Sequence, residues 1–86
     1  MEIIYSTKFA REYKKLPTEI KKIAEHNEPI FRANPFDSRL KTHKLKGKFS
    51  EFLSFSIGHK YRIIFEFSED KKTIYFLSAG DHDIYQ

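Results

Sequence analysis

The chain has 86 residues, no cysteine, nine phenylalanines, five tyrosines and a formal net charge of +4. A chain of this length has room for one hydrophobic core, so we expect a single domain over residues 1–86. The lack of cysteine excludes disulfides, thiolate metal sites and a cysteine nucleophile, and residues 1–6 show neither the basic region nor the apolar run of a signal peptide. We therefore expect a soluble, cytoplasmic protein without membrane contacts.

The first half of the chain predicts a strand followed by two helices. Residues 2–5 are mostly β-branched or aromatic, and Ser6 or Thr7 follows as a helix N-cap. Pro29 predicts a kink or an early stop in the second helix, and Asn34-Pro35 ends it. The helices are predicted from apolar side chains at helical spacing, which are Phe9, Tyr13 and Leu16 in the first and Ile20, Ile23, Ala24, Ile30 and Phe31 after Pro17.

The second half predicts strands, because apolar and polar residues alternate from Leu40 onward. Gly58-His59 and residues 68–72 are short connections, which make the strands that they join antiparallel. We therefore expect an α+β fold of order β-α-α-β-β-β, with a two-helix hairpin on one face of a mainly antiparallel sheet. The other face should be open to solvent, and the alternation places four polar residues on it: Ser54, Ser56, Arg62 and Glu66.

Positive charge is concentrated in one segment. Residues 1–48 carry twelve Lys or Arg and six Asp or Glu, whereas residues 49–86 carry four and six. Residues 39–48 hold five cations and no anion, as expected of a surface that binds a phosphate backbone. The alternative is a solvated segment that keeps a small protein soluble. On the first interpretation the RNA contacts are Lys41, Lys44, Lys46 and Lys48.

Several chemistries lack their motifs in this sequence. The histidines are far apart and Asp81-His82-Asp83 is the one cluster of histidine with carboxylates, so we expect no metal site. The isolated glycines form no phosphate-binding loop, no nucleophile elbow occurs, and no cofactor is expected. What remains is metal-independent RNA cleavage, in which the 2′-hydroxyl attacks the adjacent phosphate with the help of a base, a cation and an acid.

Three residues suit that reaction. The two aspartates beside His82 favour its protonated form, as a general acid requires. Arg62 would stabilise charge on the phosphate, and Tyr85 would stack on a base or bind the phosphate. Each also has a plainer interpretation: a solvated histidine, an arginine paired with Glu66, and a tyrosine packed on the core.

Four segments, in their order and spacing, together form a pattern that is specific to a protein family. They are Phe9-x3-Tyr13-x2-Leu16-Pro17, His43-Lys44-Leu45-Lys46-Gly47, Tyr61-Arg62-Ile63-Ile64-Phe65 and Gly80-Asp81-His82-Asp83-Ile84-Tyr85. With these segments the chain resembles, over nearly its whole length, the RelE/YafQ-like toxins of bacterial type II toxin-antitoxin pairs.

The resemblance implies a RelE-like fold and a toxin, monomeric by itself, that binds the ribosomal A site and cleaves the mRNA held there. A cognate antitoxin would wrap the toxin until stress removes it. The resemblance matches His82 to the catalytic histidine of the YafQ-like branch and Tyr85 to the aromatic residue that follows. It matches His43 to the histidine of that branch's H-x-L-x-G segment, and Arg62 to the mid-sheet arginine of the RelE branch.

The chain departs from the family where a general base is expected. Ser56 and Lys60 stand where the YafQ-like branch has a histidine and an aspartate. The paired lysines of the RelE branch fall near Leu53 and Phe55. The general base of the YafQ-like branch is therefore missing from its usual positions.

Two questions stay open in the sequence. The first is whether His43 or Glu66 supplies the base. The second is the activity itself, because the same fold carries ParE-like toxins, which poison DNA gyrase and cut no RNA, and a passive RNA- or protein-binding module is a third possibility. The combination of His82, Tyr85 and Arg62 favours the nuclease.

Overall fold

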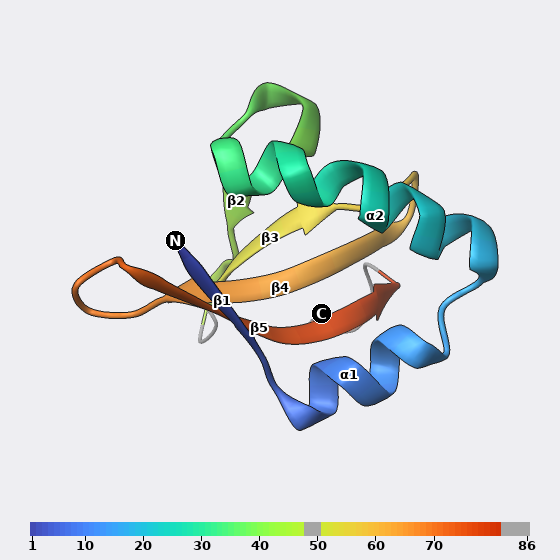
Figure 1. The fold of residues 1–86 in the computed structure, drawn as a ribbon, viewed down its shortest axis with the longest axis horizontal. Coiled ribbons are helices and arrows are strands. Elements are labelled where there is room, and N and C mark those ends of the chain that lie inside the picture. The colour runs from blue at the N-terminus through green and yellow to red at the C-terminus, as the bar shows by residue number, and fades with distance from the viewer. Residues whose placement is uncertain (48–50, 82–86) are drawn as a thin grey trace.

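A computed structural model of the chain describes residues 1–47 and 51–81 (Figure 1). The strands run antiparallel except for the first, which is parallel to the last, and the sheet order is β1-β5-β4-β3-β2. The predicted α+β fold is confirmed, and β2 is a strand that the predicted order lacked. The elements are β1 (Glu2–Tyr5), α1 (Thr7–Lys14), α2 (Thr18–Ala33), the 3-10 helix η1 (Ser38–Leu40), β2 (His43–Lys44), β3 (Leu53–Ser56), β4 (Tyr61–Phe67) and β5 (Thr73–Asp81).

The two long helices form where the apolar spacing predicted them. The Ser6 hydroxyl caps α1 by accepting a hydrogen bond of 2.9 Å from the backbone N–H of Phe9. Helix α2 continues through Pro29 to Ala33, so the proline does not stop it. Packing outweighs the one hydrogen bond that a proline removes, because Phe31, two residues further on, is fully buried. In the part of the chain that the structure describes, no helix is long and apolar enough to cross a membrane.

The core lies between the helices and one face of the sheet. Phe31 of α2 stacks on Phe55 with 4.7 Å between ring centroids, and it meets Phe65 and Phe76 edge to face at 5.0 and 5.3 Å. Phe9 of α1 also meets Phe76 edge to face, at 5.3 Å. These five rings come from five different elements and are large, so their contacts fix how both helices lie on the sheet.

The turn between β3 and β4 passes close to α2. Gly58 has a φ of +100°, and a Cβ atom there would lie 3.2 Å from Ile20 Cδ1 and 3.3 Å from Ile23 Cδ1. A glycine suits both the positive φ and the close approach, because it has no side chain. The tight connection predicted at Gly58-His59 therefore also lets α2 pack onto the end of the hairpin.

The face of the sheet away from the helices is not open throughout. Ser54, Ile64 and Ser78 are cross-strand partners in one row, and their exposed fractions are 0, 1 and 0%. The prediction that Ser54 is open to solvent is wrong, because alternation determines the side of the sheet on which a residue lies and not whether that side is covered. To either side of this row, Arg62 and Glu66 are half-buried.

Candidate functional site

The sheet register brings three predicted site residues onto one face. His43 of β2 is the partner of Ser54, which is the partner of Ile64 on β4, so these side chains share a side of the sheet. Arg62 and Glu66 lie two residues to either side of Ile64 and point the same way. The intervening residues of β4 pack in the core beneath the helices. His43, Arg62 and Glu66 therefore all lie on the face away from the helices, as alternation predicted for the last two.

Arg62 and Glu66 are at opposite ends of this face. Four residues separate them along β4, which is about 13 Å, and Ile64 lies between them. His43 is level with Ile64 but two strands away, or about 10 Å across the sheet. Within residues 1–47 and 51–81 no carboxylate forms an ion pair with Arg62, so the plainer interpretation, an Arg62–Glu66 pair, is not what the structure shows.

His43 is exposed, and its ring is held by the backbone that precedes it. Its Nδ1 atom lies 3.0 Å from the carbonyl oxygen of Lys41. Lys41 ends η1 in the left-handed conformation, with a φ of 55°, and so turns the chain into β2. A carbonyl oxygen can only accept a hydrogen bond, so Nδ1 must carry the hydrogen. In the neutral ring this leaves the lone pair on Nε2, which is then free to accept a proton.

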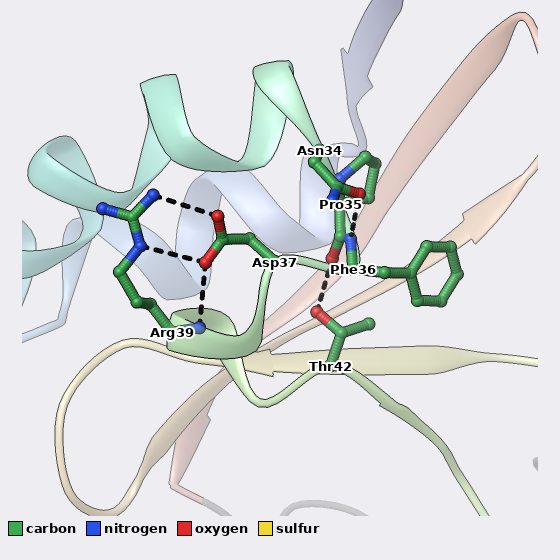
Figure 2. A network of polar contacts seen from close by, with 6 residues as sticks. All are labelled: Asn34, Pro35, Phe36, Asp37, Arg39 and Thr42. Atoms are coloured by element: carbon green, nitrogen blue, oxygen red, sulfur yellow. Dashed lines mark hydrogen bonds and ion pairs between the residues drawn. The ribbon is translucent and has the colours of Figure 1, made fainter.

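The loop before β2 is fixed by polar contacts (Figure 2). The Thr42 hydroxyl donates a hydrogen bond of 2.6 Å to the carbonyl oxygen of Pro35. The Asn34 side-chain oxygen accepts one of 3.0 Å from the backbone N–H of Phe36. These contacts tie the residue directly before His43 to the end of α2. The position of His43 therefore depends on a loop that is braced at both ends.

Asp37 neutralises one of the cations of the basic segment. Its two carboxylate oxygens accept hydrogen bonds of 2.9 Å from Nε and Nη2 of Arg39, as Figure 2 shows. The Arg39 side chain is the main cause that lowers the pKa of Asp37 to about 2. Asp37 lies just before the ten residues that the sequence singled out, so the charge count of that window missed it. The cation nearest to Asp37 in sequence is therefore already paired.

The lysines of the segment remain exposed. In residues 1–47 and 51–81 no carboxylate pairs with Lys41, Lys44 or Lys46. Because β2 is the edge strand beside β3, these lysines lie at the edge of the sheet that carries His43. Lys44, the partner of Leu53, is on the helix side of this edge, and His43 is on the other side. Lys48 lies outside the described residues.

Strand β5 ends beside Arg62. Gly80 is the partner of Arg62, and Asp81 is the partner of Tyr61 and lies 4.0 Å from the Lys60 ammonium. The strand runs from Thr73 to Asp81. The predicted acid His82 and the predicted stacking residue Tyr85 lie outside the described residues.

The positions at which the sequence departs from the family have distinct places in the fold. Leu53 and Phe55 are buried in the core and face the helices, so they present nothing to the opposite face. Ser56 is the half-buried partner of Arg62. Lys60 is exposed. Of these positions, Ser56 is the one beside the guanidinium.

A pocket of about 340 Å³ lies between the helices and the sheet, away from the candidate site, and it contains none of the predicted site residues. Among residues 1–47 and 51–81, no group of three or more His, Asp or Glu side chains is placed to hold a metal ion. The pocket is lined by Tyr5, Phe9, Ala10, Tyr13, Ala24, Glu28, Phe55, Ile63 and Phe76.

Comparisons with known proteins concern the fold. No protein-family model and no curated protein matches the chain. Among solved structures, the YoeB/ParE toxin from Agrobacterium tumefaciens is 15% identical with a TM-score of 0.78, covering 95% of this chain and 99% of that chain. YafQ from E. coli is 17% identical with a TM-score of 0.75 (93% and 91%), and the RelBE2 toxin-antitoxin complex from Mycobacterium tuberculosis is 17% identical with a TM-score of 0.74 (93% and 95%). The structural neighbours of this chain are therefore YoeB/ParE, YafQ and RelE toxins, and the chain has their fold.

Proposed function

We propose that this chain is a single-domain toxin of a type II toxin-antitoxin pair and a metal-independent endoribonuclease that cleaves mRNA at the ribosome. The observation that carries the proposal is the placement of His43 and Arg62 on one face of the sheet, beside the exposed lysines 41, 44 and 46. A proton acceptor, a phosphate-binding cation and a basic border are the parts that such cleavage needs. The fold shared with YafQ and RelE toxins supports the same conclusion.

His43 is the general base in this proposal. Its Nδ1–H is held by the Lys41 carbonyl, so the exposed Nε2 lone pair is directed to solvent or substrate. Nε2 takes the proton from the 2′-hydroxyl as O2′ forms its bond to phosphorus. The bond from phosphorus to O5′ breaks, which leaves a 2′,3′-cyclic phosphate and a 5′-hydroxyl. Glu66 lies about as far from Arg62 as His43 does, and it is the alternative base.

Arg62 binds the phosphate. A half-buried guanidinium interacts more strongly with an anion than one in open water does, and its planar donors match two phosphate oxygens. Its cross-strand partners Ser56 and Gly80 are small, so they leave room beside it. Charge that develops on the pentacoordinate phosphorus is thereby stabilised.

His82 is the acid that protonates O5′, and Tyr85 stacks on a neighbouring base. Their support is the sequence: His82 directly follows Asp81, the last described residue of β5, and that strand ends beside Arg62. Both roles follow the resemblance to the YafQ-like toxins. The acid and the phosphate-binding arginine would thus act at the same end of the sheet.

A cognate antitoxin is the proposed protein partner, and mRNA in the ribosomal A site is the proposed substrate. The RelBE2 neighbour is a toxin-antitoxin complex. An acidic antitoxin segment would complement Lys41, Lys44 and Lys46 and block RNA binding. The toxin alone would be a cytoplasmic monomer.

Induction without the antitoxin, followed by mapping of 5′ ends in cellular mRNA, tests the function. Discrete cuts within reading frames are expected from the natural chain and not from Arg62→Ala, whose fold is checked by circular dichroism. Cleavage of ribosome-free RNA by the purified toxin should persist in EDTA. DNA damage without RNA cuts would instead identify a gyrase poison, and binding without either effect would identify a passive module.

A further inference from the structure

On the side away from β4, the end of β5 is held by α1 and not by a strand. Strand β1 pairs with β5 only as far as Tyr5, which is the partner of Phe76. Beyond that point the backbone N–H of Ser6 donates to the carbonyl oxygen of Phe76 at 3.0 Å, and the Ser6 hydroxyl donates to that of Leu77 at 3.1 Å. Figure 1 shows α1 running alongside β5, where a further strand would otherwise lie.

Glu12 of α1 continues this edge. Its Oε1 atom accepts a hydrogen bond of 2.6 Å from the Ser78 hydroxyl and one of 3.1 Å from the backbone N–H of Ala79. Ser78 is fully buried and Ala79 nearly so, so both donors would lose an acceptor that water cannot easily replace. No sequence pattern singled out Glu12, which is 66 residues from Ser78 along the chain.

The contacts of Glu12 coincide with a β-bulge. Phe76 is the partner of Phe65, but Ile64 is paired with Ser78, so Leu77 is an extra residue in β5. The bulge turns every later residue of β5 to the opposite face from the one it would have in regular pairing. It places Ala79 opposite Ile63 in the core.

Without the bulge, the end of β5 would change its partners. Ser78 would lie opposite Ile63, which would put a hydroxyl into the core, and Ala79 would lie opposite Arg62 in place of Gly80. The N–H of Ala79 would then point toward β4, because N–H groups alternate between the two edges of a strand. The Glu12 carboxylate can therefore accept from Ala79 only in the bulged register.

We propose that Glu12 is a positioning residue that fixes this register and keeps Gly80 opposite Arg62. Its effect on cleavage rests on the proposed function, since it acts through Arg62. Its effect on the register does not. Glu12 thus links α1 to the end of the sheet at which the phosphate would bind.

The test compares Glu12→Ala, Glu12→Gln and Ser78→Ala with the natural chain by NMR and by cleavage kinetics. Ser68→Ala is the matched control: it removes a side-chain acceptor, 3.1 Å from the backbone N–H of Thr73, at the other end of the same hairpin. In Glu12→Ala the Ala79 amide should lose its protection from hydrogen exchange, and the contact between Ile63 and Ala79 should weaken. Glu12→Gln keeps an acceptor oxygen and should restore both.

For cleavage, Glu12→Ala should lower kcat by about 10²-fold, the effect of a small misplacement of the reacting groups, with KM and antitoxin affinity nearly unchanged. Glu12→Gln should recover most of kcat, and Ser68→Ala should not lower it. An unaltered Ala79 register in Glu12→Ala would overturn the proposal, as would equal losses of kcat in Glu12→Ala and Ser68→Ala. If Glu12→Ala does not fold, Ser78→Ala is used, which removes one of the two hydrogen bonds to Glu12: a weaker contact between Ile63 and Ala79 supports the proposal, and an unaltered contact overturns it. If the natural chain cuts no RNA, the proposed function fails while the NMR result still decides the role of Glu12.

Discussion

The Nδ1 atom of His43 lies 3.0 Å from the carbonyl oxygen of Lys41, and this contact determines which ring nitrogen can act as a base. Nitrogen-15 spectra of the neutral ring should therefore show the Nδ1–H tautomer. His43→Asn keeps an amide donor near the Lys41 carbonyl but has no proton acceptor at Nε2, so cleavage should fall by about 10²-fold or more.

Glu66→Gln removes the alternative base and should stay active if His43 is the base. Activity that is retained in His43→Asn and lost in Glu66→Gln would assign the base to Glu66 instead. Circular dichroism of both variants checks that the fold is intact.

The basic segment should control how RNA binding depends on salt. Replacement of Lys41, Lys44, Lys46 and Lys48 by Gln should flatten the dependence of log affinity on log salt by about 0.7 for each phosphate contact that is lost. A double variant with Asp37→Asn and Arg39→Gln should leave the slope unaltered, because it removes an ion pair without changing the net charge. A quadruple variant with an unchanged slope would show that RNA binds elsewhere.

The pKa of Asp37 predicts how this loop responds to acid. The hydrogen bonds from Arg39 lower the pKa from an ordinary 3.8 to about 2, so the folded protein binds a proton there less readily than the unfolded chain does. The stabilisation is therefore present above pH 3.8 and is lost as the pH falls toward 2. An NMR titration should place the carboxyl midpoint near 2 in the natural chain and higher in Arg39→Gln, where the hydrogen bond from the backbone N–H of residue 39 remains and still lowers the pKa. Identical midpoints in the two proteins would contradict the pairing.

Gly58 should be among the positions at which alanine is poorly tolerated. Gly58→Ala puts a methyl group 3.2 Å from Ile20 at a positive φ, and we expect the free energy of unfolding to fall by about 1–3 kcal/mol in urea denaturation. Gly47→Ala is the matched control, because its φ is also positive, at 69°, but no atom lies within 4 Å of the added Cβ. If the free energy of unfolding falls equally in the two variants, the contact of the added methyl group with α2 does not destabilise the protein.

The proposed acid His82 is tested by the leaving group. His82→Gln should keep the fold and the antitoxin affinity but lower cleavage by about 10²-fold or more. The loss should be smaller on an RNA in which sulfur replaces the leaving 5′-oxygen, because a thiolate leaves without a proton. Arg62 should remain necessary on both substrates. Equal losses on the oxygen and sulfur substrates would remove His82 from the role of acid.

The sequence by itself determined the elements and the fold class. Helical spacing in the first half and alternation in the second are local properties of the backbone, so they gave α1, α2 and strands β3 to β5 with small errors at their ends. Alternation also placed Arg62 and Glu66 on the same side of the sheet, because the two-residue period does not depend on what packs against it. The roles of His82 and Tyr85 remain predictions.

Only the tertiary structure decided what lies opposite each of these residues. It paired β2 with β3 and so brought His43 onto the face of Arg62, it buried Ser54, and it joined Asp37 to Arg39. The bulge at Leu77 is a further case. These features depend on the geometry of groups that meet in space, for which periodicity and composition carry no signal. The contact of Glu12 with Ser78 shows the reason, since two residues at opposite ends of the chain become neighbours only when α1 packs along β5.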